Sequence, residues 1–103
     1  MEATLDMPNE TSTDQKINLI EGGFTAQEAA YIVNSVLNVK INFHKLNRLS
    51  ITEGNSADKC EEDNGRIEEL LEAQAKAREF FTQARVNDKK VKVNATIHIS
   101  IED

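Results

Sequence analysis

Apolar and polar residues alternate without interruption in VKVNATIHISI, which covers residues 91 to 101. This period of two predicts a β-strand with one apolar face. The apolar face comprises Val91, Val93, Ala95, Ile97, Ile99 and Ile101. A shorter apolar run, KINLI at residues 16 to 20, precedes Gly22 and Gly23. We expect a strand here that the two glycines end.

Between these strands, apolar residues recur with the period of an α-helix. Thr25 and Glu28 match a capping box, so a helix should begin at about Ala26 and run to about Ser50. At about 100° per residue, its apolar side chains cover an arc of roughly 220°, which is more than one packing partner needs. They are Ala29, Ile32, Val33, Val36, Leu37, Val39, Ile41, Phe43, Leu46 and Ile51.

A second helical pattern follows the polar, turn-rich residues 52 to 65. Acidic residues at 61 to 63 and basic residues at 85, 89 and 90 match the dipole of a helix from about Asn64 to Val86. Its apolar face is narrower and rich in alanine, which allows another helix to approach closely. The face comprises Ile67, Leu70, Leu71, Ala73, Ala77, Phe81 and Ala84.

The order strand, helix, helix, strand predicts an α+β fold of βααβ type. We expect a two-stranded antiparallel sheet packed on an antiparallel helical hairpin. Such a sheet is marginal alone and leaves the long last strand with an open edge. The open edge and the broad apolar arc of the first helix both predict a homodimer. We expect its interface to include Ile32, Val36, Val39, Phe43, Ile97 and Ile99.

Composition divides the chain into a leader and one folded domain. Residues 1 to 15 are acidic, contain the only proline and lack Lys and Arg, so we expect them to be disordered. Residues 16 to 103 carry 14 acidic and 12 basic side chains and should form a single domain. No basic stripe is present, so nucleic-acid binding is not expected. No apolar stretch approaches the roughly 20 residues that span a membrane.

Three polar residues interrupt the apolar arc of the first helix. Lys40, His44 and Asn47 follow i, i+4, i+7 spacing and therefore share one side. Gln74 and Arg78 of the second helix should lie across from them. One interpretation is a pocket for an anionic ligand, with a histidine that exchanges protons near neutral pH. The other is a polar layer that fixes helix register and is closed by Glu68 or Glu72.

The sequence predicts no metal site, cofactor or catalytic residue. Zinc ligands usually come in closely spaced pairs, whereas His44, Cys60 and His98 are isolated in the sequence. The acidic surroundings of Cys60 should raise the pKa of its thiol. A single cysteine and an N-terminus without the pattern of a signal peptide favour the cytoplasm.

Four blocks of the chain, INLIEGGFTAQEAAYIV, INFHKL, GRIEELLEAQAKAREF and KVNATIHISI, resemble in their order a group of small bacterial proteins. The resemblance covers about residues 16 to 103 and implies a bacterial origin, but it contains no catalytic signature. We therefore expect a small, non-catalytic adaptor, regulator or accessory protein that acts by association. Two alternatives stay open: a small-molecule or anion-binding protein, and an acidic inhibitor of another protein.

Overall fold

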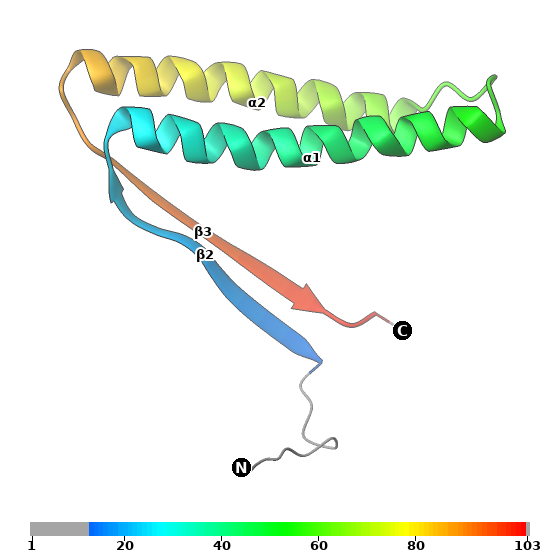
Figure 1. Cartoon of the computed structure of the whole chain (residues 1–103), viewed down its shortest axis with the longest axis horizontal. Coiled ribbons are helices and arrows are strands. Elements are labelled where there is room, and N and C mark those ends of the chain that lie inside the picture. Colours follow the sequence, from blue (N-terminus) through cyan, green and yellow to red (C-terminus); the bar gives the residue numbers. More distant parts are fainter. Residues whose placement is uncertain (1–12, 103) are drawn as a thin grey trace, which may run out of the picture. The chain divides into compact units, whose positions relative to one another are not determined.

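The computed structural model describes residues 13 to 102 and contains two strands and two helices in the order βααβ (Figure 1). The elements are β2 (Asp14–Phe24), α1 (Ala26–Gly54), α2 (Glu61–Val86) and β3 (Val91–Ser100). The predicted α+β class and element order are confirmed. The described residues form two compact units: a sheet unit up to Gly22 and from Val93 onward, and a helical unit from Gly23 to Lys92.

The leader predicted for residues 1 to 15 lies almost entirely outside the described residues. Its last two residues, Asp14 and Gln15, belong to β2, so the strand begins earlier than expected. Gly22 and Gly23 do not end this strand, which continues to Phe24. Gly22 has φ 147°, a conformation that glycine adopts at no steric cost, so it lets the extended chain continue.

β2 and β3 pair antiparallel in a two-stranded sheet, as predicted (Figure 1). The Ile101 N–H donates to the Thr13 carbonyl at 3.0 Å, and this register places Ile17 opposite Ile97. Each of these two isoleucines exposes 40–42% of its surface. The packing of the sheet on the helices and its role in a dimer stay predictions.

The capping box predicted at the start of α1 is confirmed. The Glu28 N–H donates to Thr25 Oγ1 at 3.1 Å, and the Thr25 N–H donates to Glu28 Oε1 at 2.9 Å. The helix continues to Gly54, four residues beyond its predicted end. Thr52 tolerates this extension because its hydroxyl donates to the Arg48 and Leu49 carbonyls of the preceding turn.

α2 begins at Glu61, three residues before its predicted start. Cys60 stands in front of it with φ 50°, in the left-handed region, and its N–H donates to Asp58 Oδ1 at 2.8 Å. The acidic first turn, Glu61 to Asp63, lies at the positive end of the helix dipole. Because both helices are longer than predicted, the connection shortens to residues 55 to 60, and the facing register changes.

The two helices pack along a seam whose successive members are three or four residues apart, as in antiparallel coiled coils. Its best buried apolar side chains are Ile41 and Ile67, which expose 3% and 7% of their surfaces. On α1 the seam comprises Ala30, Val33, Leu37, Ile41, His44, Arg48 and Ile51. On α2 it comprises Asp63, Ile67, Leu70, Gln74, Ala77, Phe81 and Ala84. The seam is one side chain deep on each helix, and Ala26, Ala29, Cys60 and Val91 of the same unit are buried outside it.

Candidate functional site

A polar cluster joins the C-terminal half of α1 to the first turn of α2. We call it the polar clasp; it comprises His44, Asn47, Arg48, Asp63 and Asn64. His44 Nδ1 lies 2.9 Å from Asp63 Oδ1, and Asn47 Nδ2 donates to Asp63 Oδ2 at 2.9 Å. Arg48 Nη1 donates to Asn64 Oδ1 at 2.7 Å. Both oxygens of the buried Asp63 carboxylate are therefore engaged from α1.

The carboxylate that contacts His44 is neither of the two that one interpretation of the sequence used to close the polar layer. That interpretation closed the layer through Glu68 or Glu72, because Lys40 to His44 were expected to lie across from about Leu71 to Arg78. Instead the carboxylate belongs to Asp63, which precedes Glu68 by five residues and Glu72 by nine on α2. The short connection after Gly54 brings the first turn of α2 level with His44.

The hydrogen bonds of the polar clasp determine its charge state. The His44 hydrogen bond lowers the pKa of Asp63, and the Asn47 hydrogen bond adds to this, while burial acts in the opposite direction. Asp63 is therefore a carboxylate at neutral pH, and His44 donates through Nδ1 because a carboxylate only accepts. His44 Nε2 is buried and has no hydrogen-bond partner among residues 13 to 102. The pair is therefore largely shielded from solvent between the two helices.

Cys60 lies beside the polar clasp as a free, buried thiol. Burial raises its pKa, and the negative charge of Asp58 raises it further. The thiol therefore stays protonated at neutral pH and is a poor nucleophile. Within the described part of the chain, no three His, Cys, Asp or Glu side chains are grouped closely enough to hold a metal ion.

The other residues predicted for a polar site lie away from His44 and Asn47. Lys40 places its Nζ 4.8 Å from the centre of the Phe43 ring, in cation–π geometry. Gln74 donates to Asn38 Oδ1 at 2.7 Å. Gln74 and Arg78 both line a groove between the helices. The five predicted residues are thus divided among three places and do not form one site.

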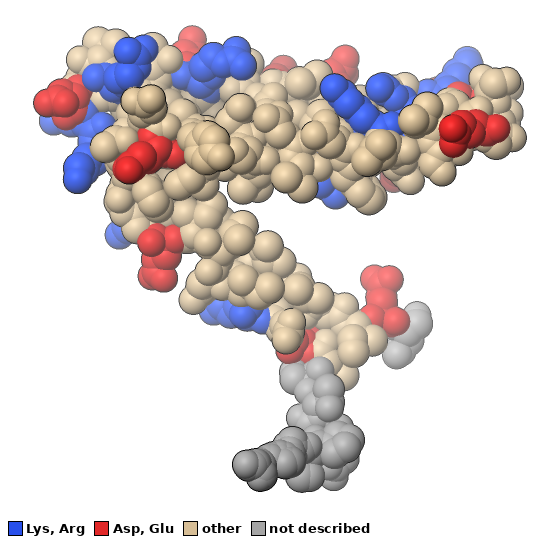
Figure 2. All heavy atoms as spheres, viewed as in Figure 1, with Lys and Arg blue, Asp and Glu red and all other residues tan. Residues whose placement is uncertain are grey.

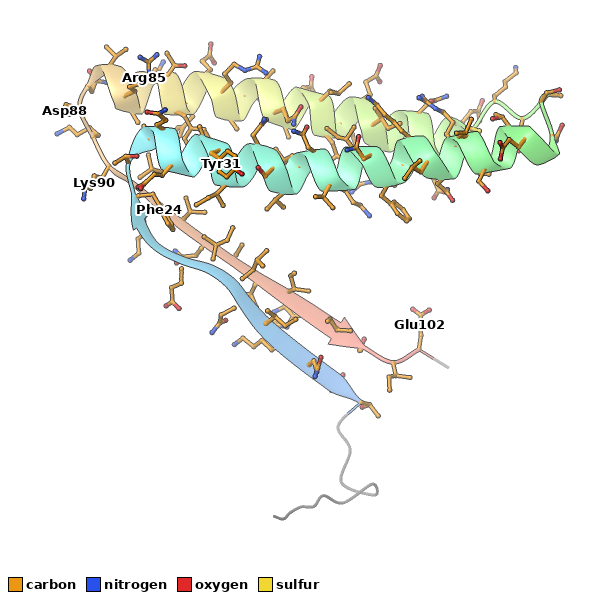
Figure 3. The ribbon with its side chains drawn as sticks, viewed as in Figure 1. Phe24, Tyr31, Arg85, Asp88, Lys90 and Glu102 are labelled. Carbon is orange, nitrogen blue, oxygen red and sulfur yellow. The ribbon has the colours of Figure 1, made fainter. Side chains whose placement is uncertain are left out.

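This groove runs between the first three turns of α1 and the last three turns of α2, with a volume of about 540 Å³. Figure 3 shows Tyr31 of α1 and Arg85 of α2 near the same end of the helical unit, and both residues line the groove. Arg85 shares a polar row of the second helix with Gln74 and Arg78, but it was not among the predicted site residues. Its seven-residue separation from Arg78, which places both on one helix face, was the available signal.

A second apolar surface lies on α1, outside the seam. We call it the α1 stripe; it comprises Ile32, Val36, Val39, Phe43 and Leu46. The last four side chains expose between 44% and 71% of their surfaces. Successive members are four, three, four and three residues apart, so they form a straight line on the helix, roughly 140° around from the seam. On the face shown in Figure 2, uncharged side chains dominate the middle of α1.

The α1 stripe contains four of the residues expected at a dimer interface: Ile32, Val36, Val39 and Phe43. Leu46 was not among them, although the same spacing includes it. The other two expected residues, Ile97 and Ile99, lie on β3, where they expose 40% and 45% of their surfaces.

Neither described helix combines the length and apolar character needed to cross a membrane. Comparison of the chain with protein-family models, with curated proteins and with solved structures found no match.

Proposed function

We propose that this chain is a non-catalytic protein-interaction module, an adaptor or regulator that acts as a homodimer through α1. The observation that carries the proposal is the α1 stripe. An apolar line at alternating three- and four-residue spacing matches the pattern by which helices recognise other helices. The seam uses one such line for α2, and the α1 stripe is a second one on the same helix.

The size of the α1 stripe supports this role. Its side chains expose on the order of 400 Å² of apolar surface, an area that often marks an interaction site on a monomer. Pairing of two α1 helices would also cover the polar side chains that flank the stripe. The surface buried on each copy, stripe and flanking side chains together, would then approach the roughly 800 Å² per partner of a standard interface.

The charge distribution is compatible with pairing of identical surfaces. The flanking residues Ser35 and Asn42 are uncharged, and Lys40 is the charged residue beside the centre of the stripe. Lys40 lies over the Phe43 ring, where part of its charge is compensated. Two copies can therefore meet along the α1 stripe without repulsion between rows of like charges.

We also propose that the protein is bacterial and works in the cytoplasm. The block resemblance supports the bacterial origin. The free thiol of Cys60, buried beside the polar clasp, supports a reducing compartment.

Sedimentation velocity over a micromolar concentration series tests the homodimer with a matched pair of variants. Phe43 and Phe80 are exposed helical phenylalanines, at 54% and 59%, but only Phe43 belongs to the α1 stripe. We expect the wild type to dimerise and Phe43→Glu to weaken dimerisation by about 100-fold or more, because a two-fold interface contains each substitution twice. Phe80→Glu should change it little. A wild type that stays monomeric, or a loss caused by Phe80→Glu alone, would refute the proposal.

A further inference from the structure

The groove between α1 and α2 has a charge that differs from that of the whole chain. The chain carries a net charge of −6, yet the residues lining the groove include Arg78 and Arg85 and no Asp or Glu. The first turn of α1, which is the positive end of that helix, also contributes Ala26 and Gln27. The groove is thus a positively charged recess in an acidic protein.

The four arginines of the chain fall into two pairs. Arg48 donates to Asn64 in the polar clasp, and Arg66 forms an ion pair with Glu69 at 2.6 Å. Arg78 and Arg85 form no ion pair within residues 13 to 102, and both line the groove. The residues three and four positions from Arg78 include no carboxylate, so the helix itself cannot supply its partner. Asp88 lies three residues after Arg85 but forms no ion pair with it. Both guanidinium groups are therefore available to an anion from outside the chain.

The floor of the groove is apolar, with Val33, Leu37 and Phe81 among its residues. It is hollow because Ala30 and Ala77 occupy seam positions here, whereas isoleucines 41 and 67 fill the seam farther along. Its volume of about 540 Å³ lies within the range of small-molecule sites. Apolar floors with a few polar groups at one side are typical of sites for organic ligands rather than for strongly hydrated inorganic ions.

We propose that this groove binds a small organic carboxylate with an apolar body, either aliphatic or aromatic. Arg78 and Arg85 hold the carboxylate, because a planar guanidinium matches a carboxylate with two parallel hydrogen bonds. Thr82 lies between them at i+4 from Arg78 and adds a hydroxyl donor at the same rim. The apolar body lies over Leu37 and Phe81. This site does not depend on dimerisation through the α1 stripe.

Titration of the full chain, observed by ¹H–¹⁵N NMR, tests the site with matched probes. The probes are decanoate and 2-naphthoate, their neutral alcohols decanol and 2-naphthalenemethanol, and inorganic phosphate. We expect saturable shifts of groove residues with at least one carboxylate, and which one responds distinguishes an aliphatic from an aromatic body. The proposal is overturned if neither carboxylate binds at millimolar concentration, if the alcohols bind equally well, or if the shifts map outside the groove.

Variants of the two arginines test how the carboxylate is held. Arg78→Gln and Arg85→Gln should each weaken carboxylate binding by about tenfold or more. Arg78→Lys should restore part of it, and Arg66→Gln, which removes an arginine far from the groove, should leave it unchanged. Ala77→Leu should weaken binding by filling the floor. If Arg78→Gln instead disrupts dimerisation and carboxylates do not bind the wild type, the groove belongs to a protein interface and the ligand site is refuted.

Discussion

Replacement of His44 by leucine tests whether the polar clasp stabilises the helical hairpin. The substitution removes the hydrogen bond to Asp63 and leaves one oxygen of a buried carboxylate without that partner. It also removes His44 Nε2, which already lacks a partner, and leucine fills a similar volume. The lost hydrogen bond to a charged group outweighs this relief, so we expect His44→Leu to lower the free energy of unfolding by about 2 kcal/mol.

A double variant tests whether the effect comes from the His44–Asp63 pair rather than from the loss of His44 alone. In His44→Leu/Asp63→Leu both partners become apolar, and no buried carboxylate remains without a donor. The double variant should therefore be more stable than His44→Leu alone. A buried polar group can fix the register of packed helices, so loss of the clasp should broaden or double the NMR signals of seam residues such as Leu70.

Urea unfolding followed by circular dichroism measures these differences. The variants should be made in the Phe43→Glu background, so that dissociation does not add to unfolding. A loss of about 2 kcal/mol should lower the urea midpoint by about 1–2 M. The account is refuted if His44→Leu is as stable as its parent, or if the double variant is less stable than either single variant.

Three further predictions concern the ends of the helices. The hydrogen bond from His44 lowers the pKa of Asp63 below the ordinary 3.8. The stabilising effect of the Asp63 carboxylate is therefore complete above pH 3.8 and is lost as the pH falls through the native pKa. Between about pH 5 and pH 2, the free energy of unfolding in urea should therefore fall more for the wild type than for Asp63→Asn. Equal decreases for the two proteins would contradict this. Cys60, buried and with a raised pKa, should react with iodoacetamide at pH 8 at least about tenfold more slowly in the native state than in urea, whereas similar rates would show that the thiol is accessible. Thr25→Ala should cost about 1 kcal/mol in urea unfolding by removing the capping box, and an unchanged stability would mean that the cap is not needed.

The fold was predictable where local signals are strong. The period of two in residues 91 to 101, the capping box at Thr25 and the acidic residues 61 to 63 each depend on neighbouring residues. The strand, the cap and the second helix are confirmed, although β3 ends at Ser100 and α2 begins at Glu61. The predicted helix ends were wrong where a residue that disfavours a helix is stabilised by a contact that the sequence does not show. Thr52 bonds back into the preceding turn, and Cys60 adopts a left-handed conformation held by Asp58.

The candidate site was predictable only in part, because contacts between helices depend on register. The i, i+4, i+7 spacing correctly placed His44 and Asn47 on one side of α1, where they share Asp63. Which carboxylate faces them follows from the length of the connection, and an error of a few residues there moves the partner by more than one helical turn. The α1 stripe was visible in the sequence only as an over-wide apolar arc, because the sequence does not show which residues α2 already covers.

The central claim is that α1 has two packing lines, one covered by α2 and one covered by a second copy. Isotope-filtered NOE spectroscopy on a mixture of ¹³C-labelled and unlabelled chains tests this most directly, since it detects only contacts between copies. The account predicts intermolecular cross-peaks between the methyl groups of Val36, Val39 and Leu46 and the ring of Phe43. Cross-peaks confined to the groove or to β3, or none at a concentration where sedimentation shows a dimer, would contradict it.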